Sequence, residues 1–177
     1  FNIIKTNTVV IKDVNDDEVI DIINHMKNFK SEIRFIEYMD VGESNKWDPS
    51  KVVSSESLLE SINEHYSLKQ MKTETSSTAK KWHIKDSNSS IGLISSITQP
   101  FCSSCNRARL SVDGKLFTCL FASNGFDIKS VIRSDNYEEK LLEFFKKIWM
   151  ERSDQYSQIR FTSKRDLPKV EMSYIGG

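Results

Sequence analysis

The chain has 177 residues, with 25 lysines and arginines against 25 aspartates and glutamates, and 38% of its residues are hydrophobic. This neutrality excludes the global positive charge that is typical of general nucleic-acid binding, so any polyanion site must be local. No apolar run reaches the roughly 18 residues that a membrane span requires. The odd count of three cysteines, all in one stretch, favours a reducing compartment and metal ligation over disulfides. We therefore expect a globular cytoplasmic protein with no membrane or nucleic-acid partner.

The first elements predict a β-α-β unit. Residues 3–12 are rich in β-branched side chains, as is typical of a strand. Apolar residues then recur at helical spacing over residues 16–29, and residues 33–38 alternate as a second strand. Ligands bind beyond the carboxyl ends of parallel strands, so residues from Met39 onward are expected at a ligand-binding edge.

The pattern then changes. Ser57 and Glu60 have the spacing of a capping box, which predicts a helix from Ser57 to about His65. The polar residues 69–78 predict an exposed loop. The elements expected after that loop are strands at 82–84 and 91–97, a hairpin of 109–112 and 115–119 around Asp113-Gly114, and a helix at 136–152.

Cys102, Cys105 and Cys119 are the candidate metal ligands. Two residues separate the first pair and 13 separate Cys105 from Cys119, while the expected hairpin returns Cys119 toward the pair. Zinc and ordinary iron–sulfur clusters take four protein ligands, so three thiolates would leave one metal position open. The spacing alone favours an iron–sulfur cluster and a structural zinc ion equally, the zinc ion taking its fourth ligand from a histidine or carboxylate elsewhere.

Basic residues accompany the cysteines. Arg107 and Arg109 have period-two spacing, so in a strand both side chains lie on one face. A solvated face or a structural salt bridge is the usual explanation for such a pair. Beside a ligand cysteine, binding of phosphate or carboxylate is at least as well favoured. Lys5 and Asn7 likewise share one face of the first strand.

The chain resembles the GTP 3′,8-cyclases, a family of radical S-adenosylmethionine enzymes of molybdenum cofactor biosynthesis. Five separated segments carry the resemblance in the family's order: KTNTVVIKDVND, EIRFIEYMDVG, NKWD, FCSSCNRARLSVDGKLFTCLFA and YIGG. They correspond to the C-terminal half of those enzymes. The motif Cys-x-x-x-Cys-x-x-Cys, which in the family holds the cluster that cleaves S-adenosylmethionine, does not occur in this sequence. We therefore expect the chain to be inactive without the missing N-terminal half of the barrel, whether it is a fragment, a truncated product or half of a split enzyme.

The resemblance implies an α/β fold. Residues 1–45 would form the last β-α-β part of an incomplete radical-SAM (TIM-like) barrel, and residues 46–177 a C-terminal α+β region that binds an iron–sulfur cluster and GTP. It also implies a [4Fe–4S] cluster on the three cysteines, with the guanine of GTP at its open iron. The implied reaction converts GTP to 3′,8-cyclo-7,8-dihydro-GTP after an adenosyl radical removes the ribose 3′ hydrogen, and the whole enzyme would be a homodimer.

The resemblance further implies roles for single residues, although it assigns no catalytic residue. The residues that match GTP-binding positions are Lys5, Arg34, Arg107 and Arg109, those that match S-adenosylmethionine contacts are Met39 and Asn7, and those that match a tail inserted in the active site are Gly176 and Gly177. The alternative is a zinc-stabilised binding module, in which the arginines near the cysteines recognise an acidic or nucleic-acid partner.

Overall fold

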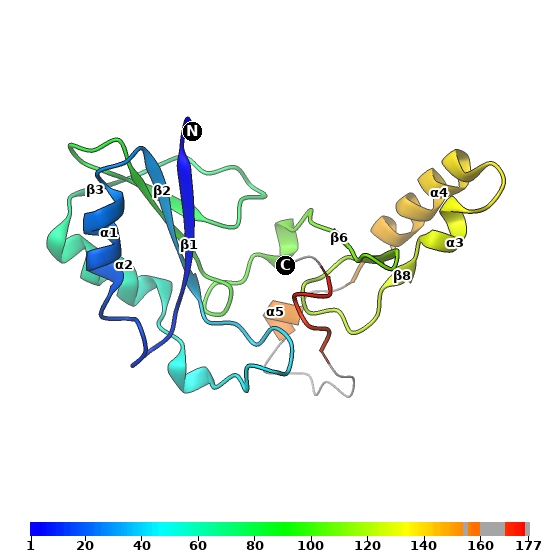
Figure 1. Ribbon diagram of the computed structural model, residues 1–177, viewed down its shortest axis with the longest axis horizontal. Coiled ribbons are helices and arrows are strands. Elements are labelled where there is room, and N and C mark those ends of the chain that lie inside the picture. Colours follow the sequence, from blue (N-terminus) through cyan, green and yellow to red (C-terminus); the bar gives the residue numbers. More distant parts are fainter. Residues whose placement is uncertain (154–155, 160–168, 176–177) are drawn as a thin grey trace. The chain divides into compact units, whose positions relative to one another are not determined.

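The structure is a computed structural model that describes residues 1–153, 156–159 and 169–175. The chain forms two compact units, Phe1–Met39 with Asp48–Ser104, and Asp40–Trp47 with Cys105–Gly177 (Figure 1). Within the described residues, no helix combines the length and the apolar character needed to cross a membrane.

The first unit is built on a mixed five-stranded sheet in the order β1-β2-β5-β4-β3. Its parallel strands are β1 (Ile4–Val10), β2 (Ser31–Glu37) and β5 (Ser90–Ile94), while β4 (Lys80–Ile84) and β3 (Leu68–Gln70) pair antiparallel to their neighbours. Helix α1 (Val19–Met26) connects the parallel strands β1 and β2. The predicted β-α-β unit is therefore confirmed, and the sheet has the mixed α/β character that the sequence indicates.

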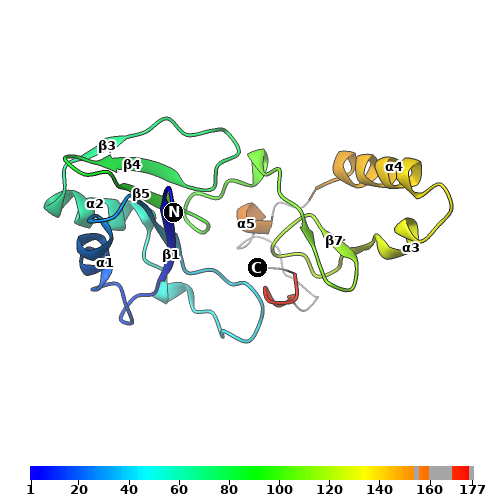
Figure 2. The ribbon, with the colours of Figure 1, turned by 45° about the horizontal axis from the view of Figure 1, so that its top comes forward.

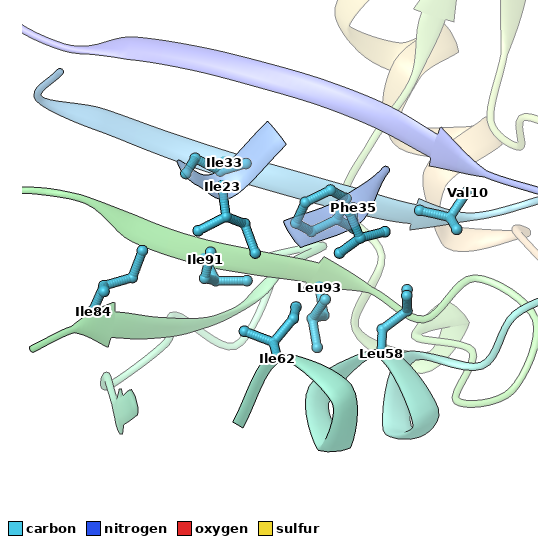
Figure 3. Close-up of a cluster of buried hydrophobic side chains, with 10 residues drawn as sticks. Val10, Ile23, Ile33, Phe35, Leu58, Ile62, Ile84, Ile91 and Leu93 are labelled. Atoms are coloured by element: carbon cyan, nitrogen blue, oxygen red, sulfur yellow. The ribbon is translucent and has the colours of Figure 1, made fainter. Parts of the chain in front are cut away.

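Helices α1 and α2 (Ser55–His65) cover one face of this sheet and enclose the core. Ile23 of α1 and Ile62 of α2 are fully buried with Phe35 of β2, and Figure 3 shows these side chains gathered between helices and strands. Each such side chain stabilises the fold by roughly 1.5–3 kcal/mol when fully buried. Because side chains alternate along a strand, Ile33 and Phe35 point to the helices and the even-numbered residues of β2 lie on the opposite face.

Helix α2 begins earlier than the sequence predicts. Its N-cap is Ser54, which is extended and accepts a hydrogen bond on Oγ from the Ser57 backbone N–H at 3.1 Å. The predicted capping box of Ser57 and Glu60 is therefore wrong, because Ser57 already lies in the first turn and its own N–H is the group that is capped.

Two other boundaries also differ from the predictions. Helix α1 begins at Val19, because Asp16 belongs to a preceding turn in which it accepts a hydrogen bond from Asp13 N at 2.8 Å and Asp13 has a φ of 59°. The predicted loop of residues 69–78 starts inside β3, since Lys69 and Gln70 pair with β4.

The described residues of the second unit form a small antiparallel sheet and several helices (Figure 2). These are β6 (Arg109–Leu110), β7 (Lys115–Phe117), β8 (Phe126–Asp127), α3 (Lys129–Ile132), α4 (Tyr137–Met150) and α5 (Tyr156–Ile159). The predicted Asp113-Gly114 hairpin is confirmed: Gly114 has a φ of 84° and donates its N–H to Ser111 O at 3.0 Å. Glycine is suited to this position because the left-handed conformation costs it little.

The compact units divide the chain differently from the functional division expected at residues 45 and 46. Strands β3, β4 and β5 belong to the same sheet as β1 and β2, so the first unit continues to Ser104. A barrel part before residue 46 and a cluster-binding part after it remain predictions.

Candidate functional site

Charged and polar side chains occupy the face of the first sheet opposite α1 and α2. On this face Lys5 and Asn7 of β1 pair in register with Glu32 and Arg34 of β2. Residues paired across adjacent strands project to the same side. The sheet thus brings together Lys5, Asn7 and Arg34, which the resemblance assigned to ligands. This surface, together with Lys81 of β4, is called the polar face below.

Glu32 links two cations on the polar face. Its Oε1 accepts a hydrogen bond from Arg34 Nε at 2.6 Å, and its Oε2 accepts one from Lys81 Nζ at 2.9 Å. Burial acts to raise the pKa of Glu32, but the bonds from Lys81 and Arg34 outweigh it and hold that pKa below its ordinary value. The ionised carboxylate therefore fixes both cations. The sequence analysis missed Glu32 and Lys81, although the period-two spacing of Glu32 and Arg34 places both on one strand face.

A second glutamate, Glu37, ends β2 just before Met39. It is fully buried, and its Oε1 accepts hydrogen bonds from Ser55 N at 2.8 Å and from the Thr98 hydroxyl. Its Oε2 accepts from the backbone N–H groups of Ile97 and Thr98 at 2.8 and 2.9 Å. The carboxylate joins the end of β2 to the start of α2 and to the segment after β5. This fixes the chain where Met39, a predicted S-adenosylmethionine contact, follows.

In the second unit, Cys105 lies next to two arginines. Burial acts to raise the pKa of the Cys105 thiol, but hydrogen bonds from the Arg152 side chain and the Arg107 backbone, with the charges of both arginines, lower it overall. Arg152 also donates from Nη1 to Cys105 O at 2.7 Å. This environment favours the thiolate, which is the form that ligates metals. The sequence analysis did not identify Arg152. This residue lies 47 positions after Cys105, and only the fold brings the two together.

Arg109 interacts electrostatically with the thiols of Cys105 and Cys119 in the second unit. Burial and the neighbouring Arg107 lower the pKa of Arg109, while Cys119 and Cys105 act in the opposite sense. The hairpin explains this proximity, because Arg109 pairs with Phe117 and Cys119 follows two residues later. The structure therefore brings together Arg107, Arg109, Cys105 and Cys119.

Cys102 lies in a short 3-10 helix, Cys102–Ser104, which ends the first unit. Cys102, Cys105 and Cys119 form no disulfide, and each is half-buried. Across residues 1–153, 156–159 and 169–175, no group of three or more His, Cys, Asp or Glu side chains has an arrangement that could hold a metal ion. A site formed by all three thiolates thus stays a prediction.

The described tail of the chain is fastened within the second unit. Lys169 Nζ lies 2.9 Å from Oδ2 of the buried Asp40, and Glu171 Oε1 accepts hydrogen bonds from Glu43 N and Ser44 N at 2.9 and 3.1 Å. Ile175 is fully buried. The tail residues expected at the active site, Gly176 and Gly177, lie outside the described residues.

Comparisons with known proteins show which family the chain resembles. A family model described as Molybdenum Cofactor Synthesis C matches residues 31–158. Proteins named GTP 3′,8-cyclase from Staphylococcus aureus strains JH9, Newman and Mu3 / ATCC 700698 are each 44% identical to this chain over 179 residues. The match covers 98% of this chain and 53% of each relative, so the chain spans about half the length of these curated relatives.

Fold and site together define an α/β protein with a mixed, partly parallel sheet and a hairpin region in which Arg109 interacts with Cys105 and Cys119. The chain belongs to the Molybdenum Cofactor Synthesis C family. The similarity to GTP 3′,8-cyclases that its motifs indicate is confirmed.

Proposed function

We propose that this chain is the GTP-binding part of a radical S-adenosylmethionine GTP 3′,8-cyclase, which converts GTP to 3′,8-cyclo-7,8-dihydro-GTP in molybdenum cofactor biosynthesis. One observation carries the proposal: Arg107 and Arg109 lie with the thiols of Cys105 and Cys119 in one hairpin region. A metal site and an anion site at the same place suit a ligand that has both a metal-binding base and phosphates.

The donor set fits an iron–sulfur cluster on Cys102, Cys105 and Cys119. None of these cysteines is in a disulfide, and the arginines around Cys105 favour the thiolate that iron requires. When bound, a [4Fe–4S] cluster on three cysteines supplies one iron with a position for a non-protein ligand. The chain's own part is to hold these thiolates and to exclude water around them.

The basic residues would bind the phosphates of GTP. Arg107 and Arg109 offer planar guanidinium groups that match phosphate oxygens in a bidentate manner. Lys5 and Arg34 add two cations on the polar face of the first sheet. Orientation of the ribose through such contacts is the contribution that a protein makes to radical chemistry.

Asn7 and Met39 would contact S-adenosylmethionine in the whole enzyme, where that cofactor and its own cluster supply the radical chemistry. The chain spans about half of its curated relatives, and we expect it to be inactive without the other half of the barrel. Gly176 and Gly177 would complete the site, and the whole enzyme would be a homodimer. Cysteines without disulfides, together with the proposed iron–sulfur centre, fit a reducing, cytoplasmic location.

Anaerobic reconstitution of the chain tests this proposal, followed by iron and sulfide analysis and by electron paramagnetic resonance with and without GTP. About four irons and four sulfides per chain, with a spectrum that GTP alters, are the expected result. A matched Cys102→Ala variant should lose most of the iron. One zinc ion without sulfide would instead favour the zinc-stabilised binding module.

A further inference from the structure

We propose that Glu32 is a positioning residue for nucleotide binding, and that Lys81 is a further phosphate contact beside Arg34. The inference rests on the proposed function insofar as GTP is the ligand. It assigns a role to Glu32, the acidic side chain that the described strands place on the polar face, and to a lysine of β4, a strand that contributes none of the other site residues.

The exposure of the three side chains suggests this division of roles. The Glu32 side chain is only 6% exposed, whereas those of Arg34 and Lys81 are 23% and 27% exposed. The carboxylate is therefore buried, and the two cations bonded to it are partly exposed to solvent and accessible to a ligand. A buried carboxylate is costly unless its oxygens are well bonded, and here each oxygen serves one cation.

Arg34 is held in a way that leaves part of its guanidinium for a ligand. Nε donates a hydrogen bond to Oε1 of Glu32, and Nη2 forms an ion pair with the same oxygen. The residues described in the structure give Nη1 no hydrogen-bond partner. A guanidinium fixed along one edge keeps its orientation, so less conformational entropy is lost when phosphate binds.

Gly92 makes room for this arrangement. It pairs with Arg34 on one side and with Lys81 on the other, so the three residues form a row across β2, β5 and β4. A Cβ at Gly92 would lie 3.1 Å from Arg34 Cγ. The stem of Arg34 therefore lies against the backbone of β5, in space that any other residue would partly fill.

The charge of the polar face suits a polyanion. In the described strands, the pairing register places one acidic residue, Glu32, on this face. The basic residues that it places there are Lys5, Arg34, Lys69 and Lys81. Replacing Glu32 by glutamine would remove the negative charge of this carboxylate. Simple attraction then predicts tighter binding of a triphosphate, whereas loss of positioning predicts weaker binding. The two explanations differ in sign.

Calorimetric titration of the full 177-residue chain with GTP tests the inference. We expect E32Q to weaken GTP binding about tenfold, which corresponds to one charge-assisted contact. Guanosine, which has no phosphate, should bind both forms equally. Glu60→Gln on the exposed side of α2 is the charge-matched control and should leave the GTP affinity unchanged. Circular dichroism verifies that each variant is folded.

A double-mutant cycle separates positioning from general destabilisation. If Glu32 acts partly through Arg34, E32Q should weaken GTP binding less in an R34Q background than in the unmodified chain, with the remaining loss arising through Lys81. Lys81→Met should weaken GTP binding with guanosine binding intact. If E32Q does not fold, Gly92→Ala replaces it, since it displaces the Arg34 stem while Glu32 remains.

The outcomes distinguish this inference from the proposed function. No GTP binding by the unmodified chain would overturn the proposed function and the inference with it. Normal binding that E32Q leaves unchanged or strengthens would overturn only the inference, as would an equal loss in the R34Q background. An unaltered GTP affinity in Gly92→Ala would likewise overturn only the inference.

Discussion

Tyr174 donates a hydrogen bond from its hydroxyl to Oδ2 of Asp113 over 2.7 Å, joining two residues 61 positions apart. Asp113 lies in the turn of the β6–β7 hairpin, and Tyr174 lies in the tail. The Tyr174 ring also packs edge-on against Phe117 of β7, with ring centroids 6.3 Å apart. The tail is thus tied to the hairpin that leads to Cys119.

This contact predicts a pH response. Hydrogen bonds from the Ser111 hydroxyl and then from the Tyr174 hydroxyl lower the pKa of Asp113 from 3.8 to about 2. A depressed folded-state pKa means that the ionised carboxylate stabilises the fold above pH 3.8, and that this contribution is lost as the pH falls toward 2. Carbon NMR titration of the Asp113 carboxyl should show its pKa rising in Tyr174→Phe, and rising further in Ser111→Ala. An unchanged midpoint in both variants would contradict the assignment.

The N-cap of α2 gives a second prediction. Ser54→Ala should destabilise the fold by about 1 kcal/mol, because the Ser57 N–H loses its acceptor. Ser57→Ala is the matched control and should change stability by less than about 0.5 kcal/mol, since that side chain is exposed on the helix. Urea unfolding measures both. The reverse order of effects would restore the capping box that the sequence suggested.

The buried Glu37 gives a third prediction. Glu37→Gln keeps the size of the side chain but replaces one acceptor oxygen with an NH2 group. That group would face donors from Thr98 and either Ile97 or Ser55, so we expect a loss of about 1–3 kcal/mol in the free energy of unfolding. The exposed Glu60→Gln should have little effect in the same urea experiment. Equal stability of the two variants would show that the buried carboxylate is dispensable.

A fourth prediction concerns the arginines of the hairpin region. In a full-length form of the proposed cyclase, replacing Arg107 and Arg109 by alanine should weaken GTP binding at least tenfold while iron content is retained, because each guanidinium would supply charge-assisted bonds to phosphate. Lysine at both positions should also lose affinity, since it lacks the bidentate geometry. Arg133→Ala, an exposed arginine of the same unit, is the control. Calorimetry that gives equal GTP affinity for all forms would remove the two arginines from the site.

Local patterns in the sequence predicted the local features of the structure. The β-α-β unit and the hairpin followed from periodicity and from the Asp113-Gly114 turn, because each depends on residues close together in the chain. The helix boundaries were less accurate. Three aspartates precede α1 and several serines lie around the start of α2, and only the backbone conformation decides where each helix begins.

By itself, the sequence determined the family, the cysteine segment and the residues that bear positive charge, since motifs and their spacing are properties of the chain. The tertiary structure decided which charges meet. Glu32 reaches Lys81 over 49 positions and Glu37 reaches Thr98 over 61, because the strand order places β5 and β4 after β2 in the sheet. Such pairings depend on sheet topology and on the burial that makes an unpaired carboxylate costly, and no local pattern carries either.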